Sequence, residues 1–327
     1  MNASLQYLQQ CAGQSGFQLQ SLEKVIRLGT LAGAIAAHPL LGKALALKGG
    51  TALNLCLGEA PTRLSVDLDY NYVAHPDREA MQAARPEVEE AVENIARRLG
   101  FRLQRSADAF AGRKIYAIYA SALGPEDRVE VDLNFLWRQP LAGVVRAELW
   151  QPGELDRPQI AIVSRLELGI GKLLAFVDRS APRDAWDVAQ YRNTMGDTSN
   201  HPEFRACFIA LSAMLPHPLS TYTRAVVASR LTPRLTQEQL VPMLSAGATP
   251  DPDQLFDTAW SVAEPLLDLT PQEQDYVEAI HKGELRLELL FPNEPAQATR
   301  LADHPAILWK LRNVQQRLPH QTTRPEF

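Results

Sequence analysis

Hydrophobic and polar positions alternate with a period of two in several short stretches of the N-terminal half. Residues 65–70 (SVDLDY) and 128–135 (RVEVDLNF) alternate strictly, which is typical of strands with one buried face. The run 44–48 (ALALK) is also strand-like and ends at two glycines. Residues 113–119 (RKIYAIY) are rich in strand-forming types, and we expect them to pair with 101–105 across a loop that contains glycine. These runs predict a sheet.

A long helix is expected between the second and third of these strand-like regions. Asp77 is a suitable N-cap, because its carboxylate can accept a hydrogen bond from a backbone N–H of the first turn, and Gly100 marks the end. Pro86 lies inside this stretch and predicts a break or a kink, since proline removes one helical hydrogen bond and clashes with the preceding turn.

The pattern changes to a helical period near residue 160. Residues 165–178 carry an apolar stripe at helical spacing, and Thr236 and Thr270 each precede a glutamate or glutamine at the third position, which predicts capping boxes. The sequence therefore predicts an α/β (α+β) fold. A mixed-sheet core domain is expected over 1–160, and a mainly helical domain that contributes to the same cleft over 161–327.

The composition is that of an ordinary globular protein. The 327 residues are 46% hydrophobic and 22% charged, with a formal net charge of −5, which excludes disordered and collagen-like chains. The longest nearly apolar run, 31–41, is interrupted by His38 and Pro39 and is shorter than the ~18 residues of a membrane span. The N-terminus does not resemble a signal peptide, and the three scattered cysteines predict neither a disulfide nor a zinc site. We expect a soluble, cytoplasmic protein that does not associate with membranes.

Charged residues are unevenly distributed. Between positions 251 and 294 there are eleven acidic residues against two basic ones, a stretch that could face a basic partner or form ordinary solvated helix surfaces. A basic stretch between positions 95 and 118 could contact phosphate. Its basic residues are Arg97, Arg98, Arg102, Arg105, Arg113 and Lys114.

Two glycines, Gly49 and Gly50, follow the first strand-like run and precede a helix-like stretch. Glycine lets backbone N–H groups approach a ligand closely, and the N-terminus of a helix favours negative charge. A pair of glycines also occurs in ordinary tight turns, so the feature alone is weak evidence for a phosphate site.

Two aspartates, Asp67 and Asp69, lie two residues apart on the next predicted strand, so their side chains share a face. Like charges held together are costly unless a cation neutralises them, and paired carboxylates on a strand are a common way to hold Mg²⁺. Asp132 on a later strand offers a third carboxylate, and Glu130 on the same face is its rival. Three carboxylates beside a phosphate-binding turn are the arrangement that two-metal nucleotidyl transfer requires.

The order of these motifs resembles the polymerase-β-like nucleotidyltransferase superfamily, whose signature is Gly-Gly-Thr/Ser, a spacer, and Asp-hydrophobic-Asp. Residues 48–70 (KGGTALNLCLGEAPTRLSVDLDY) are similar to the AbiEii/AbiGii toxin branch, in which KGGTAL, Arg-x-Ser and DLD occur in that order. Lys172, followed by residues 183–187 (RDAWD), is similar to the family's lysine and its R-D-x-x-D segment. Residues 304–313 (HPAILWKLRN) resemble its C-terminal signature.

The resemblance implies groups that bind the nucleotide phosphates and carboxylates that ligate Mg²⁺. The implied phosphate-binding residues are Gly49, Gly50, Thr51, Ser65 and Lys172. The implied catalytic residues are Asp67, Asp69, Asp132, Lys172 and Asp187, of which the first three are the metal ligands. Two choices stay open: Asp184 is an alternative to Asp187, and Ser65 with Arg63 could position phosphate or only cap the strand.

The implied activity is Mg²⁺-dependent transfer of a nucleoside monophosphate from an NTP to an acceptor hydroxyl. The chain would be the toxin of a bacterial toxin–antitoxin (abortive infection) system, with RNA, most simply tRNA, as acceptor and a cognate antitoxin as partner. Its negative net charge also fits a second hypothesis, in which the acceptor is a hydroxyl of a protein side chain. A third hypothesis is a catalytically idle module that binds a nucleotide or a partner.

Overall fold

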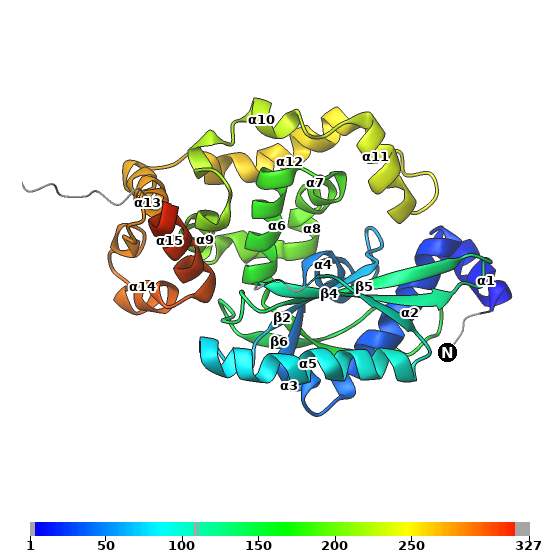
Figure 1. Ribbon diagram of the computed structural model, residues 1–327. Helices are drawn as coiled ribbons and strands as arrows, with labels where there is room; N and C mark the ends of the chain where they lie inside the picture. The colour runs from blue at the N-terminus through cyan, green and yellow to red at the C-terminus, as the bar shows by residue number, and fades with distance from the viewer. Residues whose placement is uncertain (1–3, 108, 110, 318–327) are drawn as a thin grey trace, which may run out of the picture.

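The computed structural model describes residues 4–107, 109 and 111–317 (Figure 1). Within these residues, seven strands form one mixed sheet in the order β3-β4-β5-β2-β1-β7-β6. β2 is parallel to β5 and β1 to β7, and the other neighbours are antiparallel. The strands are β1 (Leu45–Lys48), β2 (Asp67–Tyr72), β3 (Arg102–Arg105), β4 (Gly112–Ala120), β5 (Glu126–Asn134), β6 (Val144–Glu148) and β7 (Gln159–Val163).

The strands expected from the alternating patterns are present, and β4 pairs with β3 as expected. Sequence patterns did not predict β6 and β7. The reason for β7 is that its sequence, QIAIV, is a short continuous apolar run, which suits a buried strand and a buried helix equally well.

The fifteen α-helices of the described residues cover the sheet and build a separate layer beside it (Figure 1). They are α1 (Leu5–Ser15), α2 (Leu19–Ala37), α3 (Leu41–Ala44), α4 (Gly49–Cys56), α5 (Arg78–Arg98), α6 (Arg165–Arg179), α7 (Pro182–Ala189), α8 (Tyr191–Met195), α9 (Phe204–Leu211), α10 (Arg224–Ala228), α11 (Pro233–Gln239), α12 (Pro252–Leu267), α13 (Pro271–His281), α14 (Pro295–Ala302) and α15 (Pro305–Arg317).

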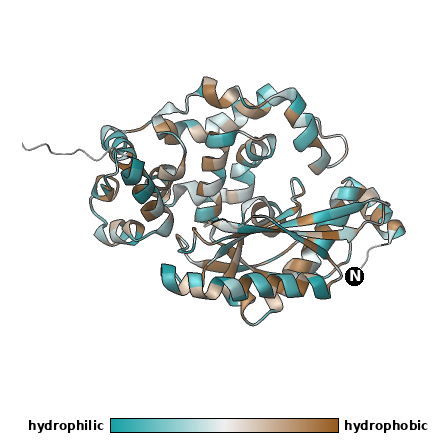
Figure 2. Ribbon diagram, in the orientation of Figure 1, coloured by the Kyte–Doolittle hydropathy of each residue, from teal (hydrophilic) through white to brown (hydrophobic). Residues whose placement is uncertain are grey.

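The two faces of the sheet differ in character. Leu68, Ile115 and Val131 are buried on the face that α2 and α5 cover. Asp69 and Asp132 lie on the opposite face, because side chains alternate along each strand. Figure 2 shows the alternation as hydrophobic and hydrophilic residues within single strands and helices. One face of the sheet therefore supplies the core, and the other is free to carry chemistry.

Helix α5 begins at the predicted N-cap and continues past the proline at which a break or a kink was predicted. The Asp77 carboxylate accepts a hydrogen bond from the Ala80 N–H at 2.8 Å, so the predicted N-cap is confirmed. The helix runs through Pro86 without a break, contrary to the prediction of a break there. Pro86 is exposed, and the buried side chains of Val88 and Val92 hold the helix against the sheet, so packing offsets the lost hydrogen bond.

One of the two predicted capping boxes is present. The Thr270 hydroxyl accepts from the Glu273 N–H at 3.3 Å, and the Glu273 carboxylate accepts from the Thr270 N–H at 2.8 Å. The prediction for Thr236 is wrong, because α11 begins earlier, with Thr232 as its N-cap and Pro233 in the first turn. Proline at the first helical position favours that earlier start.

Along the chain, the last strand of the sheet ends just before Ser164, and the helical part begins there. β7 extends to Val163, and the Ser164 hydroxyl caps α6 by accepting from the Glu167 N–H at 3.3 Å. We therefore propose the division between an N-terminal unit and a helical unit at this residue, slightly beyond 160. Among the described residues, no helix is both long and apolar enough to cross a membrane.

Candidate active site

Acidic side chains line up across the two central parallel strands. In the register of β2 and β5, Asp67 is opposite Glu130, and Asp69 is opposite Asp132. Paired residues on adjacent strands project from the same face, so these four carboxylates occupy one polar surface of the sheet. The structure thus places Asp67, Asp69 and Asp132 on one face of the sheet, with Glu130 on the same face, and their convergence on a metal ion stays a prediction.

Burial and mutual repulsion raise the pKa of two of these groups. Burial raises the pKa of Asp67, Arg183 opposes this, and the charge of Asp69 adds to it. Burial also raises the pKa of Asp132, Lys114 opposes this, and Asp69 again adds to it. Burial and the neighbouring carboxylates thus disfavour the charged forms of Asp67 and Asp132, and a bound cation would favour them.

A lysine flanks the acidic pair on each neighbouring strand, β1 on one side and β4 on the other. Lys48 of β1 is in register with Asp69, and Lys114 of β4 is in register with Asp132. The Lys114 ammonium bonds Glu130 and lies 3.5 Å from Asp132 Oδ2, and Arg183 Nη1 lies 3.8 Å from Asp67 Oδ2. Within the ranges that the structure describes, no three His, Cys, Asp or Glu side chains stand close enough together to hold a metal ion. The donor set itself, made only of carboxylate oxygens, is the one that Mg²⁺ prefers.

The diglycine turn faces this surface. Gly49 has a φ of 69°, and a Cβ on it would lie 2.6 Å from Asp69 Oδ2. A Cβ on Gly50 would lie 2.8 Å from Arg63 Nη2 and 2.9 Å from Ser65 Oγ. Both positions therefore need glycine, the first for its backbone conformation as well as for space. The turn opens α4, so the N-terminal N–H groups of that helix lie next to the aspartates.

The hydroxyls of Thr51 and Ser65 fasten α4 to β2. Thr51 Oγ1 is 3.0 Å from Ser65 Oγ and donates to the backbone carbonyl of Asp67 at 2.5 Å. Both side chains are buried. In this structure the two hydroxyls therefore fix the turn against the aspartate strand.

A buried ionic network joins the helical unit to the turn. Asp187 accepts from Arg63 Nε at 2.8 Å and from Arg63 Nη2 at 2.6 Å, and its second oxygen also lies 2.8 Å from Lys172 Nζ. Lys172 Nζ in turn donates to Asp184 at 2.8 Å, and Asp184 binds Arg179 Nε at 2.6 Å. Three cations and two carboxylates leave one net positive charge in the network, of which Arg63 Nη2 lies next to Gly50.

The network stays ionised because its charges outweigh desolvation. Burial by itself would raise the pKa of Asp187, but Arg63 and Lys172 hold it below its ordinary value. Burial would likewise lower the pKa of Lys172, but Asp184 and Asp187 raise it. Asp184 and Asp187 thus both bind buried cations in this structure, and the choice between them as the functional acid stays a prediction.

Arg63 is a residue whose role the sequence did not decide, since it could position phosphate or only cap the strand. Its side chain is 2% exposed, and it also donates to the Leu64 carbonyl at 2.8 Å. Asn54 supports the same pair, donating to Asp187 Oδ1 at 3.0 Å. The only signal for this in the sequence is the Arg-x-Ser motif before the aspartates, because nothing local indicates that Asp187 lies across from it.

Glu167 is a buried acid that the sequence patterns did not single out. It lies in the first turn of α6, where Oε1 accepts from Asn71 Nδ2 and Oε2 from the Leu141 N–H, both at 3.0 Å. Burial raises the pKa of Glu167 to about 7, although these hydrogen bonds and the charge of Lys48 oppose the shift. Asn71 follows Asp69 by two residues on β2, so this titrating group borders the acidic surface.

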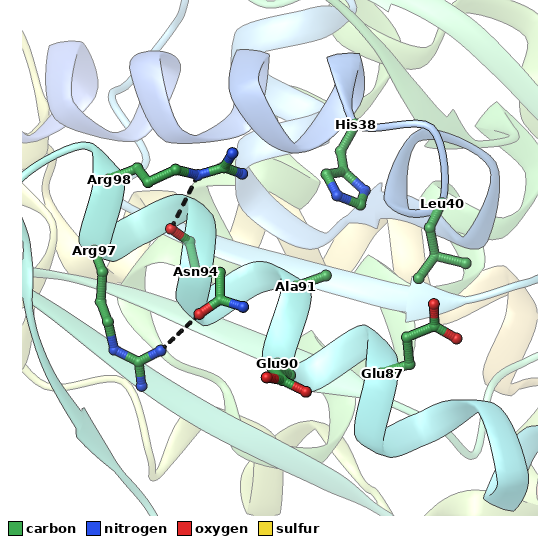
Figure 3. A pocket seen from close by; sticks show the side chains of 8 residues that line it. All are labelled: His38, Leu40, Glu87, Glu90, Ala91, Asn94, Arg97 and Arg98. Atoms are coloured by element: carbon green, nitrogen blue, oxygen red, sulfur yellow. Dashed lines mark hydrogen bonds between the residues drawn. The ribbon is translucent and has the colours of Figure 1, made fainter.

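The basic stretch between positions 95 and 118 is largely neutralised. Arg97 and Arg105 both bind Glu93, Arg102 binds Glu126, and Arg113 binds Glu89. A hollow of about 590 Å³ lies between the end of α2 and α5, on the other side of the sheet from the acidic surface (Figure 3). Its Arg97 and Arg98 side chains bond Asn94. The predicted phosphate contacts of this stretch gain no support from these pairings.

The site combines a diglycine turn that admits close backbone approach, carboxylates in register on two strands, and a cationic network. Transfer from a nucleoside triphosphate requires these features, so the fold and site define a nucleotidyltransferase. The comparisons name the group within that class. Residues 31–262 match the family described as the nucleotidyl transferase AbiEii toxin of type IV toxin–antitoxin systems, and the chain belongs to this family. The resemblance inferred from its motifs is confirmed, and membership implies an NTP substrate and an antitoxin partner.

A solved structure shares the fold. MenT4, a nucleotidyltransferase toxin from Mycobacterium tuberculosis H37Rv, superposes with a TM-score of 0.62 at 17% sequence identity. The match covers 92% of this chain and 99% of that chain, so it includes the helical unit as well as the sheet. Comparison with curated protein sequences gives no significant match.

Removing the charge of Asp187 tests whether the network stabilises the fold. Asp187→Asn leaves Arg63 and Lys172 buried with one counter-charge fewer, and we expect it to lower the free energy of unfolding by about 3–5 kcal/mol. Urea denaturation measures the loss. Asp275→Asn, at an exposed position of α13, is the matched control and should change stability by less than ~0.5 kcal/mol. Equal stability of both variants would show that the network is not structural.

Glu167 predicts a pH dependence of stability with a definite sign. The folded protein binds a proton at Glu167 below about pH 7, whereas the unfolded chain does so only near the ordinary value of 4.5. Stability is therefore lost as pH rises from 4.5 through about 7.

Glu167→Gln removes this titration. With the Asn71 amide turned over, the glutamine Nε2 can donate to Asn71 Oδ1, which is buried without a hydrogen-bond partner in this structure, while the glutamine oxygen still accepts from the Leu141 N–H. We expect the variant to exceed the wild type in stability by roughly 2–3 kcal/mol at pH 8 and to match it near pH 4.5. Thermal denaturation across this pH range measures the difference. Glu87→Gln, at an exposed position, should follow the wild type at every pH. Parallel curves for Glu167→Gln and the wild type would contradict the assignment.

Proposed function

We propose that this chain transfers a nucleoside monophosphate from an NTP to an acceptor hydroxyl at the polar face of its sheet. The observation that carries the proposal is the register of β2 and β5, which sets Asp69 beside Asp132 directly opposite the diglycine turn. Such a concentration of negative charge has a cost in an idle protein, which argues against a module without activity.

Asp67, Asp69 and Asp132 are the proposed ligands of the divalent cation, with Mg²⁺ as the ion that suits all-oxygen ligands and phosphate. When bound, the ion would neutralise the triphosphate and lower the pKa of the attacking hydroxyl. Lys114 already bonds Glu130 directly, so Asp132 is the freer of these two acids. Its raised pKa suits the proposed role of accepting the proton of the acceptor hydroxyl.

The phosphates are proposed to lie on the turn at Gly49 and Gly50. The absence of side chains there admits close approach to the backbone N–H groups at the start of α4. The surplus charge of the network that contains Arg63 and Lys172 attracts the triphosphate from behind the turn. Asp187 has both oxygens occupied, so it acts in this proposal by positioning Arg63 and Lys172.

The proposed acceptor is RNA, with tRNA as the substrate to test first. Membership in a toxin family supports a cellular target, and the acceptor's chemistry is limited to a molecule that presents a hydroxyl. A protein acceptor is the competing outcome. The proposed location is the cytoplasm, where NTPs and tRNA meet.

Incubation with labelled NTPs, Mg²⁺ and total RNA tests the activity. The wild type should label RNA, and Asp69→Asn should lose at least about a hundredfold in rate because a charge needed in the transition state is gone. Asp156→Asn is the charge-matched control, because Asp156 is exposed and lies outside the strands that carry the acidic surface, and it should keep full activity. Label that survives nuclease but not protease would replace RNA by a protein acceptor. Absence of label from every substrate with folded wild type would overturn the proposal.

Cation binding can be tested without any substrate. A bound divalent ion stabilises only the folded state, by about 1.4 kcal/mol at ten times its Kd, so Mg²⁺ or Mn²⁺ should raise the Tm of the wild type. Asp69→Asn should lose this shift and be at least as stable as the wild type without metal, because repulsion from Asp67 and Asp132 is relieved. Asp156→Asn should keep the shift. An equal shift in Asp69→Asn would place the ion elsewhere.

A further inference from the structure

A groove of about 440 Å³ runs between the C-terminal helix α15, the start of α5 and the segment that follows β5. The family match ends at residue 262, so α15 lies outside the part of the chain that it covers. Leu136, in the groove wall, lies two residues beyond the end of β5, the strand that carries Asp132. The groove therefore begins just beyond the end of this strand.

The groove combines guanidinium groups with an exposed indole. Arg78, Arg138 and Arg312 line it, and the Trp309 side chain beside them is 39% exposed. Two acids also line it, Asp77 and Asp303. Three cations thus face two carboxylates, and the Asp77 carboxylate is engaged in capping α5.

Arg138 carries a charge that its surroundings compensate poorly. It is 8% exposed, and it donates from Nε to the Pro76 carbonyl at 2.5 Å and from Nη1 to the Phe135 carbonyl at 3.3 Å. It forms no ion pair with any residue that the structure describes. Burial lowers the pKa of Arg138, and Asp77 offsets this only in part. A buried guanidinium held in place by carbonyls alone is a fixed site for an anion.

Arg312 is exposed on α15 and has no hydrogen bond or ion pair within the described residues. It lines the groove together with Trp309, one turn earlier on the same helix. A flat aromatic face beside guanidinium groups is how proteins hold single-stranded nucleic acid, with a base on the ring and phosphate on the cations. An acidic peptide would use the same cations but would not need the indole.

We propose that this groove binds the single-stranded end of the acceptor RNA, with a phosphate at Arg138 and Arg312 and a base against Trp309. The inference rests on the proposed function for the identity of the strand. It assigns the recognition of the acceptor to α15 and the chemistry to the sheet.

Binding of a fluorescein-labelled single-stranded RNA octamer, followed by anisotropy in a salt series, tests the groove without relying on catalysis. Trp309→Ala should weaken binding by about 5- to 150-fold, and Trp309→Phe should restore most of it, because phenylalanine keeps a stacking face. Arg312→Ala should reduce the slope of log Kd against log salt by about 1. Arg317→Ala, on the same helix but outside the groove lining, is the matched control and should change that slope less.

The transfer assay then separates this proposal from the preceding one. If the wild type labels RNA, the groove variants should raise the KM for RNA and leave the KM for the NTP unchanged. If the wild type binds the octamer through Trp309 yet labels nothing, the groove stands and the proposed activity fails. Equal octamer binding by Trp309→Ala and the wild type would overturn the proposal that the groove binds RNA. Displacement of the octamer by polyglutamate at equal charge concentration, with no dependence on Trp309, would also overturn it.

Discussion

Asp187 holds Arg63 with both of its oxygens, and this buried ion pair joins the helical unit to the turn at which a nucleotide is proposed to bind. Without Asp187, the buried Arg63 guanidinium would lose its counter-charge, at a cost of several kcal/mol, and Lys172 would keep only Asp184. The ion pair therefore holds α7, which carries Asp187, next to the diglycine turn. The position of α6, which carries Lys172, follows from the same constraint.

The acidic surface differs from this network in the sign of its charge, because its carboxylates are not fully paired with cations. Asp69 and Asp132 lie side by side between two lysines, and the pKa of Asp67 and of Asp132 rises in consequence of burial and repulsion. The contrast has a functional meaning. Charges behind the turn are paired within the network with one positive charge in surplus, whereas the carboxylates in front of it are proposed to bind a cation.

The helical unit contributes through two distinct regions in this picture. Helix α6 supplies the cations Lys172 and Arg179 and α7 supplies the carboxylates of the network behind the diglycine turn, and α15 lines an aromatic and basic groove near the end of β5. In the basic stretch on α5 and β3, Arg97, Arg102 and Arg105 are instead paired with glutamates. Net charge along the sequence is thus a poor guide to where nucleic acid can bind, because pairing decides which cations are available.

The sequence by itself determined the strands with clear alternation, the cap at Asp77, the diglycine turn, and the common face of Asp67 and Asp69. These are local properties, since a two-residue period or a capping side chain acts within a few positions. It could not determine the parallel pairing of β2 with β5, the continuity of α5 through Pro86, or the partner of Arg63. Only the tertiary structure decided these, because each depends on packing or charge compensation between segments far apart in the chain, where burial makes an unpaired ion too costly to leave alone.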